Sequence, residues 1–286
     1  MNYEKHSNSK GFRGGGQSNL SSITGIGAGS EPFSAAEQRT IKSGFTLAEV
    51  LITLGIIGVV AAMTLPTLIQ KHNEKVMVSK LKKSYSIMQQ AYLMAVRDKG
   101  TPDQWGLIDN VNTDQDVDDI NDVNNFLYHM KDYLKITKYC GSKAEGCWVD
   151  TKGLHGHPAF NSESRKIYSK ALLADGSQIL TIVANPSCTS QFGQVKDICG
   201  YYRIDVNGKQ PPNTMGKDTF TFYITKTRIV PAGSQMEEGG SYSFTNSCKD
   251  AKTHEGRGCT AWVLYNENQD YLHCSDLSWD GKKTCK

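Results

Sequence analysis

The sequence lacks several patterns on which enzyme and nucleic-acid-binding assignments commonly rest. It contains no G-x-S-x-G, Walker-type or H-E-x-x-H motif, so catalysis has no support from a recognisable motif. Its 286 residues carry a formal net charge of only +3 and no long basic stripe, which argues against a nucleic-acid partner. No cysteine pair has the C-x-x-C spacing of a zinc ribbon or a thioredoxin-like redox site. We therefore expect a protein that is not an enzyme.

Cysteine is absent from the N-terminal part of the chain and frequent near its C-terminus. The eight cysteines are Cys140, Cys147, Cys188, Cys199, Cys248, Cys259, Cys274 and Cys285. Taken as sequence neighbours they lie 7, 11, 11 and 11 positions apart, which suits short disulfide-closed loops, although many other connectivities are open. Disulfides persist outside the reducing cytosol, so we expect the chain after residue 70 to be exported.

Large apolar residues are scarce in residues 1–44, where GFRGGG and SNLSSITGIGAGS stand. Such a segment buries too little surface to offset its ordering entropy, and we expect it to be disordered. The next segment has the opposite character. From Val50 to Ile69 it runs twenty residues without a charge, which is enough to cross a bilayer as a helix. Glu49 stands at the edge of this run, where lipid makes a carboxylate costly.

A helical pattern continues after Pro66. Alternating spacings of four and three place one set of residues on a single helix face: Met77, Leu81, Ser84, Met88, Ala91 and Ala95. The pattern stops near Gly100-Thr101-Pro102. We therefore expect one long helix over residues 45–100, with a membrane-spanning half at 45–69. A second, shorter helix is expected between Val117 and Tyr133, with aspartates at its positive N-terminal end.

From residue 165 the pattern changes to that of strands. KIYSKALL and QILTIVA flank Asp175-Gly176, which is a hairpin signal, and GYYRIDV and TFTFYIT flank a longer loop. TRIV and AWVLY are shorter strand candidates. The expected fold is α+β, with the long N-terminal helix packed on an antiparallel sheet and a disulfide-rich C-terminal tail. Residues 101–286 would form an extracytoplasmic globular domain.

Three interpretations of the apolar segment compete. A secretory signal peptide would have a shorter apolar run and a small-residue cleavage site after it, neither of which is present. A plain single-pass anchor fits the length but does not explain Glu49. The third interpretation rests on Gly44-Phe45-Thr46-Leu47-Ala48-Glu49, followed by a long apolar helix that contains Pro66. This order closely resembles the N-terminal signature of type IV pilins and type II secretion pseudopilins.

The resemblance implies a processing and assembly pathway. A prepilin peptidase would cut after Gly44, remove residues 1–44 as a leader, and leave a Phe45 amine that is then N-methylated. Glu49 would come fifth in the mature chain and pair with the amine of Phe45 on a neighbouring subunit. The alternative is that the Glu49 side chain only reaches the lipid headgroups and has no role in assembly. Further implied partners are other pilin or pseudopilin subunits, an inner-membrane assembly platform and membrane lipid.

The implied function is that of a structural subunit of a type IV pilus-like or type II secretion filament. It would be a single-pass protein of the inner membrane with its C-terminal domain outside the cytoplasm, and would assemble into a periplasmic or surface filament. The alternatives are a membrane-tethered binding or adhesion module that does not polymerise and, more distantly, an exported enzyme.

Two features depart from the family's common pattern. The leader is long, with five Lys or Arg residues and three Glu residues. The distribution of positive charge also favours the opposite topology, with the C-terminal part in the cytoplasm. Residues 25–44 contain only Arg39 and Lys42, whereas residues 70–89 contain five lysines. We give the cysteines and the cleavage signature more weight, since a large folded domain need not follow this charge rule.

Three stretches have side chains that can bind metals. Asp205, Asn207 and Asp218 offer hard oxygen ligands on one loop. Some pseudopilins hold a structural calcium ion in a loop of their C-terminal domain, so one interpretation of this loop is a calcium site. The alternative interpretation is an ordinary hairpin turn. His155-Gly156-His157 has no suitable third ligand beside it and is interpreted as a surface loop. The stretch from Asp114 to Asp118 lacks the glycine and glutamate of a calcium loop and is interpreted as the charged start of a helix.

Overall fold

The structure is a computed structural model, and two compact units make it up, Met1–Leu54 and Gly55–Lys286. The residues that it describes are 44–109, 122–142, 145–160, 168–237, 239–249 and 255–285. The expected leader apart from Gly44, and the aspartate stretch that includes Asp114, Asp116 and Asp118, lie outside these ranges.

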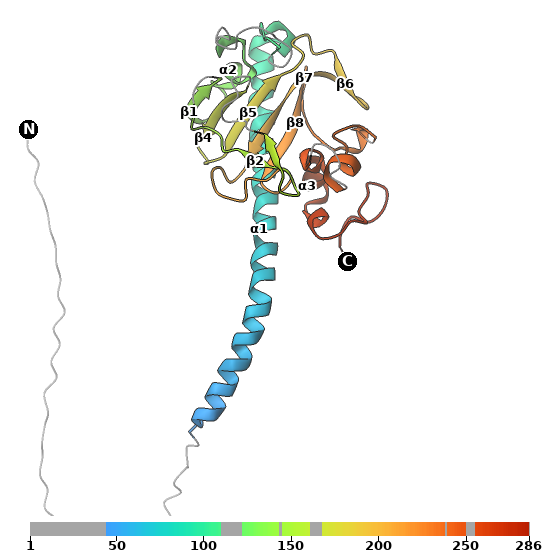
Figure 1. Ribbon diagram of the computed structural model, residues 1–286. Coiled ribbons are helices and arrows are strands. Elements are labelled where there is room, and N and C mark those ends of the chain that lie inside the picture. The colour runs from blue at the N-terminus through green and yellow to red at the C-terminus, as the bar shows by residue number, and fades with distance from the viewer. Residues whose placement is uncertain are drawn as a thin grey trace, which may run out of the picture. The chain divides into compact units, whose positions relative to one another are not determined.

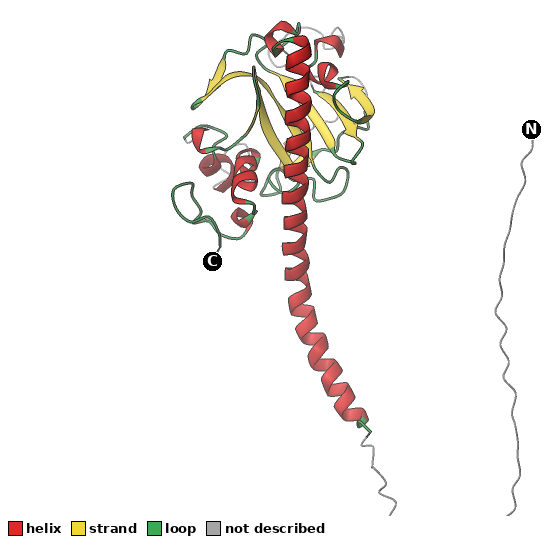
Figure 2. Cartoon of the chain, turned by 180° about the vertical axis from the view of Figure 1, so that it is seen from behind, coloured by secondary structure: helices red, strands yellow, loops and turns green. Residues whose placement is uncertain are grey.

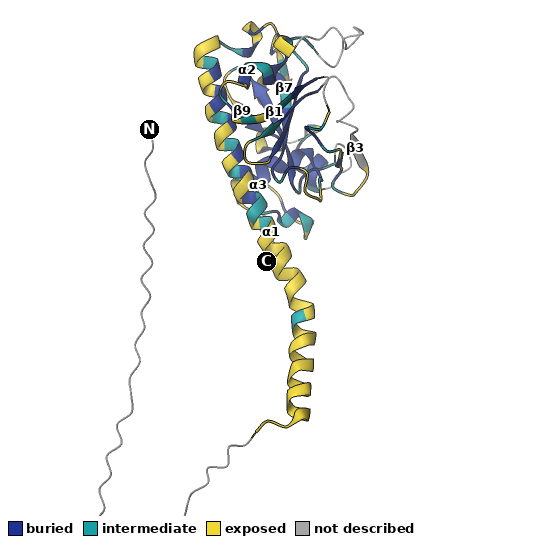
Figure 3. Cartoon of the chain, turned by 90° about the vertical axis from the view of Figure 1, so that its left-hand side faces the viewer, coloured by how far each residue is buried: buried dark blue, intermediate teal, exposed yellow. Residues whose placement is uncertain are grey.

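Helix α1 (Leu47–Lys99) is continuous and contains Pro66 (Figure 1). It is long and apolar enough over its first half to cross a membrane. In this half the apolar side chains are exposed, as Figure 3 shows in yellow, so their burial must come from lipid or from another molecule. The large exposed side chains from residue 55 onward are Ile56, Ile57, Val59, Val60, Met63, Leu65, Leu68 and Ile69.

The second half of α1 packs on the sheet, as Figure 2 shows from behind. The buried residues of the helix are Val78, Leu81, Ser84, Met88, Ala91, Tyr92 and Ala95. They include five of the six positions that the spacing predicted; the sixth, Met77, is partly buried against the same core. Polar contacts fix the packing, because the Tyr92 hydroxyl donates to Thr225 O and the Ile229 amide donates to Gln89 Oε1 at 3.0 Å.

The main sheet has seven strands, and every adjacent pair is antiparallel. They are β1 (Ile136–Gly141), β4 (Ser169–Leu173), β5 (Gln178–Val183), β6 (Ser190–Phe192), β7 (Val195–Asp205), β8 (Thr219–Thr225) and β9 (Ile229–Pro231). The order is β1-β4-β5-β7-β8-β9, and β6 pairs with β7. A separate pair joins β2 (Thr151–Lys152) to β3 (Pro158–Phe160). The α+β fold is therefore confirmed.

Strand β8 lies inside the sheet with both of its faces covered. Phe220, Phe222 and Ile224 belong to the core that α1 closes, whereas Tyr223 belongs to a second cluster on the opposite face. All seven residues of this strand are buried. A strand buried on both faces should be apolar or β-branched throughout, and TFTFYIT has that composition.

The remaining helices correct two expectations. Helix α2 spans only Phe126–Met130, so the second helix is shorter in its described part than the sequence predicted. AWVLY is not a strand but part of helix α3 (Thr260–Asn266), and that prediction is wrong. The helix turns Ala261, Trp262 and Val263 inward, all three fully buried. A five-residue apolar run has no periodicity that separates helix from strand, so tertiary packing decides the outcome.

Four disulfides join the cysteines as sequence neighbours, which is the pairing that their spacing favoured. The bonds are Cys140–Cys147, Cys188–Cys199, Cys248–Cys259 and Cys274–Cys285. Short single-turn helices connect these regions at Pro102–Gln104, Asp122–Asn124, Gln235–Glu237, Arg257–Cys259 and Asp270–Leu272, and a π-helical turn spans Thr245–Lys249.

Candidate functional site

The N-terminal signature forms a capped helix start. The amide and the hydroxyl of Thr46 each donate to Glu49 Oε2 at 2.8 Å, and the Glu49 amide donates back to Thr46 Oγ1 at 3.2 Å. This reciprocal arrangement is a capping box, which satisfies backbone donors that the first turn of a helix leaves without partners. The residues of the cleavage signature therefore also decide where α1 begins.

The predicted processing residues lie next to this cap and are open to solvent. Gly44 has nothing within 4 Å of the position where a side chain would begin, and Phe45 is 86% exposed. Glu49 is exposed as well. Gly44, Phe45 and Glu49 thus lie together on an accessible segment, but cleavage and methylation stay predictions.

Thr46 is the residue that the sequence analysis missed. Its role could have been found from the spacing, because Thr46-x-x-Glu49 before an apolar run is the sequence pattern of a capping box. Besides the assembly role expected from the sequence, the Glu49 carboxylate therefore has a local structural role.

The β7–β8 loop brings Asp205 and Asp218 to neighbouring positions. Asp205 pairs with Thr219 at the end of the two strands, and the Val206 amide donates to Asp218 O at 3.0 Å. The strands therefore hold the ends of the loop together. Both carboxylates are buried.

The oxygens of this loop converge. The carboxylate of Asp218 accepts the Asn213 amide at 2.8 Å and the Thr214 amide at 2.6 Å. One end of the Asn213 side-chain amide lies 3.1 Å from Gly208 O and 3.2 Å from Asp205 Oδ2. With nitrogen at this end the amide donates to both oxygens; with oxygen there, three oxygens face one another. Asn207 Oδ1 is buried and has no hydrogen-bond partner among the described residues.

Burial changes the protonation of both carboxylates. Removal from water, reinforced by the neighbouring Asp218, raises the pKa of Asp205 to about 8. Burial also raises the pKa of Asp218, and the backbone donors of Thr214 and Asn213 oppose the shift. Two acids held close in an apolar setting repel when both are ionised, so this setting favours a proton or a cation on at least one of them.

The histidine pair that was considered for metal binding is instead in contact with Glu255. His157 Nδ1 lies 2.8 Å from Glu255 Oε1, and the His155 amide donates to Glu255 Oε2 at 3.2 Å. Both histidines are exposed, which agrees with a surface loop. In the part of the chain that the structure describes, no three His, Cys, Asp or Glu side chains are grouped to hold a metal ion.

Two family models match the chain in adjacent segments. One, described as the prokaryotic N-terminal methylation motif, matches residues 39–65 and confirms that this segment carries the prepilin-type signature. The other, described as a family of unknown function (DUF6613), matches residues 67–277. No curated protein and no solved structure shows significant similarity. The boundary between the two matches falls at Pro66.

Proposed function

The chain belongs to the family of unknown function DUF6613 and carries a prokaryotic N-terminal methylation motif, and from these two facts we propose that it is a structural subunit of a membrane-assembled filament. The motif makes it a type IV pilin-like or pseudopilin-like protein. The filament would be a type IV pilus or a type II secretion pseudopilus, and the role of the subunit would be structural rather than catalytic.

The observation that carries this proposal is the combination of the motif with the exposed apolar half of α1. A side-chain surface of this length and apolarity is stable in lipid or against copies of itself, and not in water. Lipid would hold the processed subunit before assembly. In the filament, neighbouring helices would replace lipid, so that apolar burial is exchanged rather than lost.

Within this proposal Glu49 supplies the signal for assembly. Cleavage after Gly44 would create a positive amine at Phe45, and a carboxylate in a membrane segment is costly until it has a partner. The amine of a neighbouring subunit is that partner. An uncleaved chain has no such amine and would stay in the membrane.

The globular domain supports an extracytoplasmic location. Its four disulfides need an oxidising compartment to persist. We place this domain in the periplasm or at the cell surface, with α1 as the single anchor.

Calcium in the β7–β8 loop is proposed as a structural element of the same domain. Asp205, Asn207 and Asp218 would hold the ion, with the side chain of Asn213 and the carbonyl of Gly208 as further oxygens. The support is the position of the two buried carboxylates at the ends of one loop and the buried Asn207 Oδ1, which has no hydrogen-bond partner among the described residues. A bound calcium ion offsets the negative charge of two buried carboxylates.

Processing is tested by mass spectrometry of the mature N-terminus. The full chain is expressed in a bacterium with and without its prepilin peptidase, and the membrane fraction is digested. We expect an N-terminal peptide that begins with methylated Phe45 only when the peptidase is present. A chain that keeps residue 1 in both strains contradicts the processing step and favours a permanent tether.

Assembly is tested separately on sheared surface and periplasmic fractions. Electron microscopy with an antibody against the globular domain should label filaments, and the label should vanish in the peptidase-deficient strain. A processed chain that stays entirely in detergent-soluble monomers contradicts the filament, while leaving the processing result intact.

A further inference from the structure

A cavity of about 750 Å³ lies in the second unit, where α1, the β7–β8 loop and the C-terminal segment meet. From α1 it is lined by one helix face that includes Pro66, Ile69 and Glu74 and ends at Lys80. Its volume is in the range of small-molecule binding pockets. On this helix face Pro66 and Ile69 are apolar, and Lys80 at the other end carries a charge.

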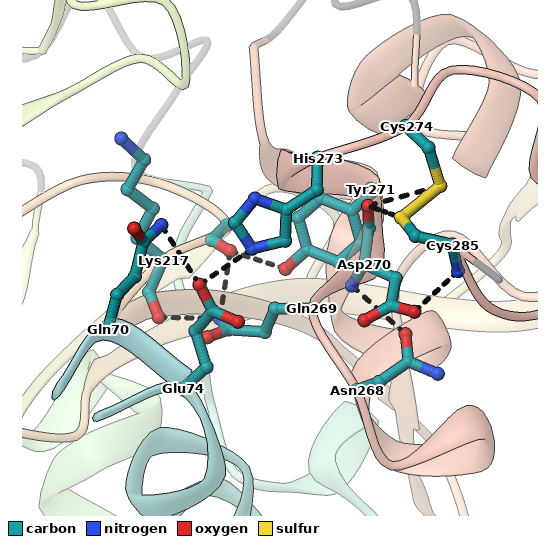
Figure 4. A network of polar contacts seen from close by, with 11 residues as sticks. Gln70, Glu74, Lys217, Asn268, Gln269, Asp270, Tyr271, His273, Cys274 and Cys285 are labelled. Atoms are coloured by element: carbon teal, nitrogen blue, oxygen red, sulfur yellow. Dashed lines mark hydrogen bonds and ion pairs between the residues drawn. A yellow bond between two sulfur atoms is a disulfide. The ribbon is translucent and has the colours of Figure 1, made fainter. Parts of the chain in front are cut away.

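The walls of this cavity are fixed by contacts between segments that are far apart in the sequence (Figure 4). His273 Nε2 lies 2.8 Å from Glu74 Oε1, which ties the C-terminal segment to α1. Gln269 Nε2 donates to Gly216 O at 3.2 Å and to Lys217 O at 2.7 Å, and the Tyr271 hydroxyl also donates to Gly216 O. Gln269 and Tyr271 are buried. The cavity is therefore built into the fold rather than left between loose segments.

The cavity is positively charged at its polar end. Lys80, Lys217 and Lys249 all line it, each from a different segment. Within the described part of the chain, none of these three ammonium groups takes part in an ion pair. The two carboxylates in the lining are already partnered, Glu74 by His273 and Asp218 by backbone amides. An anion that entered would meet three lysines, against two carboxylates whose oxygens are already engaged in hydrogen bonds.

The position along α1 places this cavity at the level of the lipid headgroups. The uncharged run ends at Gln70, and Lys71 is the first charge after it. At 1.5 Å per residue, Pro66 lies about 6 Å inside this boundary and Lys80 about 15 Å outside it. The headgroup layer is roughly 5–7 Å thick on each side of the hydrocarbon core. The apolar end of the cavity at Pro66 thus borders the acyl chains. The backbone of Lys80 lies beyond the headgroup layer, and its long side chain, which leans toward the N-terminus of the helix, extends back toward the phosphates.

We propose that this cavity binds the phosphate-bearing headgroup of an anionic phospholipid while the subunit stands in the membrane. The lysines contact the phosphate, and the surface around Pro66 and Ile69 receives the glycerol end of the acyl chains. The bound lipid would hold the globular domain against the membrane surface. This inference rests on the membrane placement of α1 and not on filament assembly, so the two can fail separately.

The test uses the full chain in detergent micelles, with calcium chelated so that the ion cannot bridge lipid to carboxylates. Phosphatidylglycerol and phosphatidylcholine are added in turn, and native mass spectrometry counts bound lipid. We expect one tightly bound phosphatidylglycerol and a much weaker phosphatidylcholine. The double variant Lys80→Gln/Lys217→Gln should lose about fivefold in affinity per lysine, or about 25-fold in total.

The control replaces two exposed lysines outside the cavity, as Lys135→Gln/Lys196→Gln, with the same change in net charge. It should bind phosphatidylglycerol like the unaltered chain. Equal loss in both double variants, or equal binding of the two lipids, overturns the proposal. Displacement by an excess of inorganic phosphate would instead assign the cavity to free phosphate and overturn the lipid assignment. A single variant, Lys217→Gln, provides the measurement if the double variant does not fold.

Discussion

The Thr46 amide and hydroxyl both donate to Glu49 Oε2, and the Glu49 amide returns a hydrogen bond to Thr46 Oγ1. The carboxylate that is expected to receive a neighbour's amine is thus already engaged within its own chain. A carboxylate has acceptor capacity on both oxygens, and the two Thr46 bonds use only Oε2. The cap and the intersubunit pair can therefore coexist.

The two roles of Glu49 can be separated by two substitutions. Glu49→Gln removes the charge but keeps an oxygen for the Thr46 donors, whereas Glu49→Leu removes both. We expect both variants to be processed and to enter filaments severalfold less than the unaltered chain, because the neighbour's amine loses its counter-charge. Quantitative immunoblots of sheared filaments measure the effect. Normal incorporation of the Gln variant contradicts the pairing with Phe45.

Processing should depend on the residue before the cut. Gly44→Val should leave an unprocessed precursor in the membrane, because the peptidase has to accept the glycine at the cleavage point. Gly55→Val is the matched control, since a side chain at either glycine meets nothing within 4 Å. Peptide mapping of membranes should find a terminus at Phe45 in the control only. The same terminus in the Gly44 variant would show that the cleavage point is misplaced.

The disulfides should differ in their resistance to reduction. Cys285 is exposed and Cys274 half-buried, whereas Cys188 and Cys199 are buried. Exported protein should contain no free thiol, and mild reductant under native conditions should open Cys274–Cys285 first. Differential alkylation with peptide mapping measures the order. Replacing Cys188 and Cys199 by alanine should lower the free energy of unfolding by about 3 kcal/mol, the value for a loop of this size.

Calcium should raise the melting temperature of the full chain in detergent. Binding to the folded form alone adds about 2.7 kcal/mol at a concentration a hundredfold above the dissociation constant. Asp205→Asn keeps an acceptor for its neighbours but loses the charge, so it should abolish the calcium effect. Because burial raises the pKa of Asp205 to about 8, the variant no longer has to take up a proton on folding, and its chelated melting temperature at neutral pH should be higher than that of the unaltered chain. Asp218→Ala is less suitable, because Asp218 also accepts the amides of Asn213 and Thr214. Identical melting with calcium and with chelator would mark the loop as an ordinary hairpin turn.

Stability should fall as the pH rises because of Glu237. This side chain is buried, and its Oε2 accepts the Gly233 amide at 2.8 Å. Burial raises the pKa of Glu237 to about 8, from an ordinary value of 4.5. Between these two pKa values the folded chain holds a proton that the unfolded chain has released. The contribution of Glu237 to the free energy of unfolding is therefore complete below the pKa of the unfolded chain and is lost as the pH rises through the pKa of the folded chain. The loss is up to about 1.4 kcal/mol per pH unit.

Urea unfolding at about pH 5.5 and about pH 8, with calcium chelated, measures this pH dependence. Glu237→Gln keeps a polar group for Gly233 and should make the profile less steep; the slope that remains comes from Asp205, whose pKa burial also raises to about 8. Glu145→Gln, at an exposed position, should leave the profile unchanged. An unaltered slope in the Glu237 variant would mean that this carboxyl stays ionised in the fold.

The elements that local pattern specifies could be predicted from the sequence. The uncharged run and the spacings of three and four predicted α1, and strand β8 coincides with TFTFYIT. Strand β1, Ile136–Gly141, was not predicted, because ITKYCG contains two exposed polar positions and no clear alternation. AWVLY became a helix because burial of Trp262 against the core, rather than local propensity, determined its conformation.

In the candidate sites, too, local sequence patterns predicted some features, whereas others depend on tertiary structure. The sequence predicted that Asp205 and Asp218 lie on one loop between two strands, and the pairing of these strands brings the two residues close together. Asn213 could not be predicted, because its approach to Asp205 depends on the path of the middle of the loop. Contacts such as that between Glu74 and His273 join segments 199 positions apart, and no local pattern specifies them.

Every disulfide described above joins residues only 7 or 11 positions apart. This locality matters for the proposed export of the domain, in which the chain would cross the membrane in an extended form. Each bond needs only its own short segment to have emerged on the far side, so oxidation can follow translocation from one end to the other. No early bond has to wait for a distant cysteine or be reopened when the next one arrives. The pairing therefore allows the four disulfides to form one after another, in the order in which their segments emerge from the membrane.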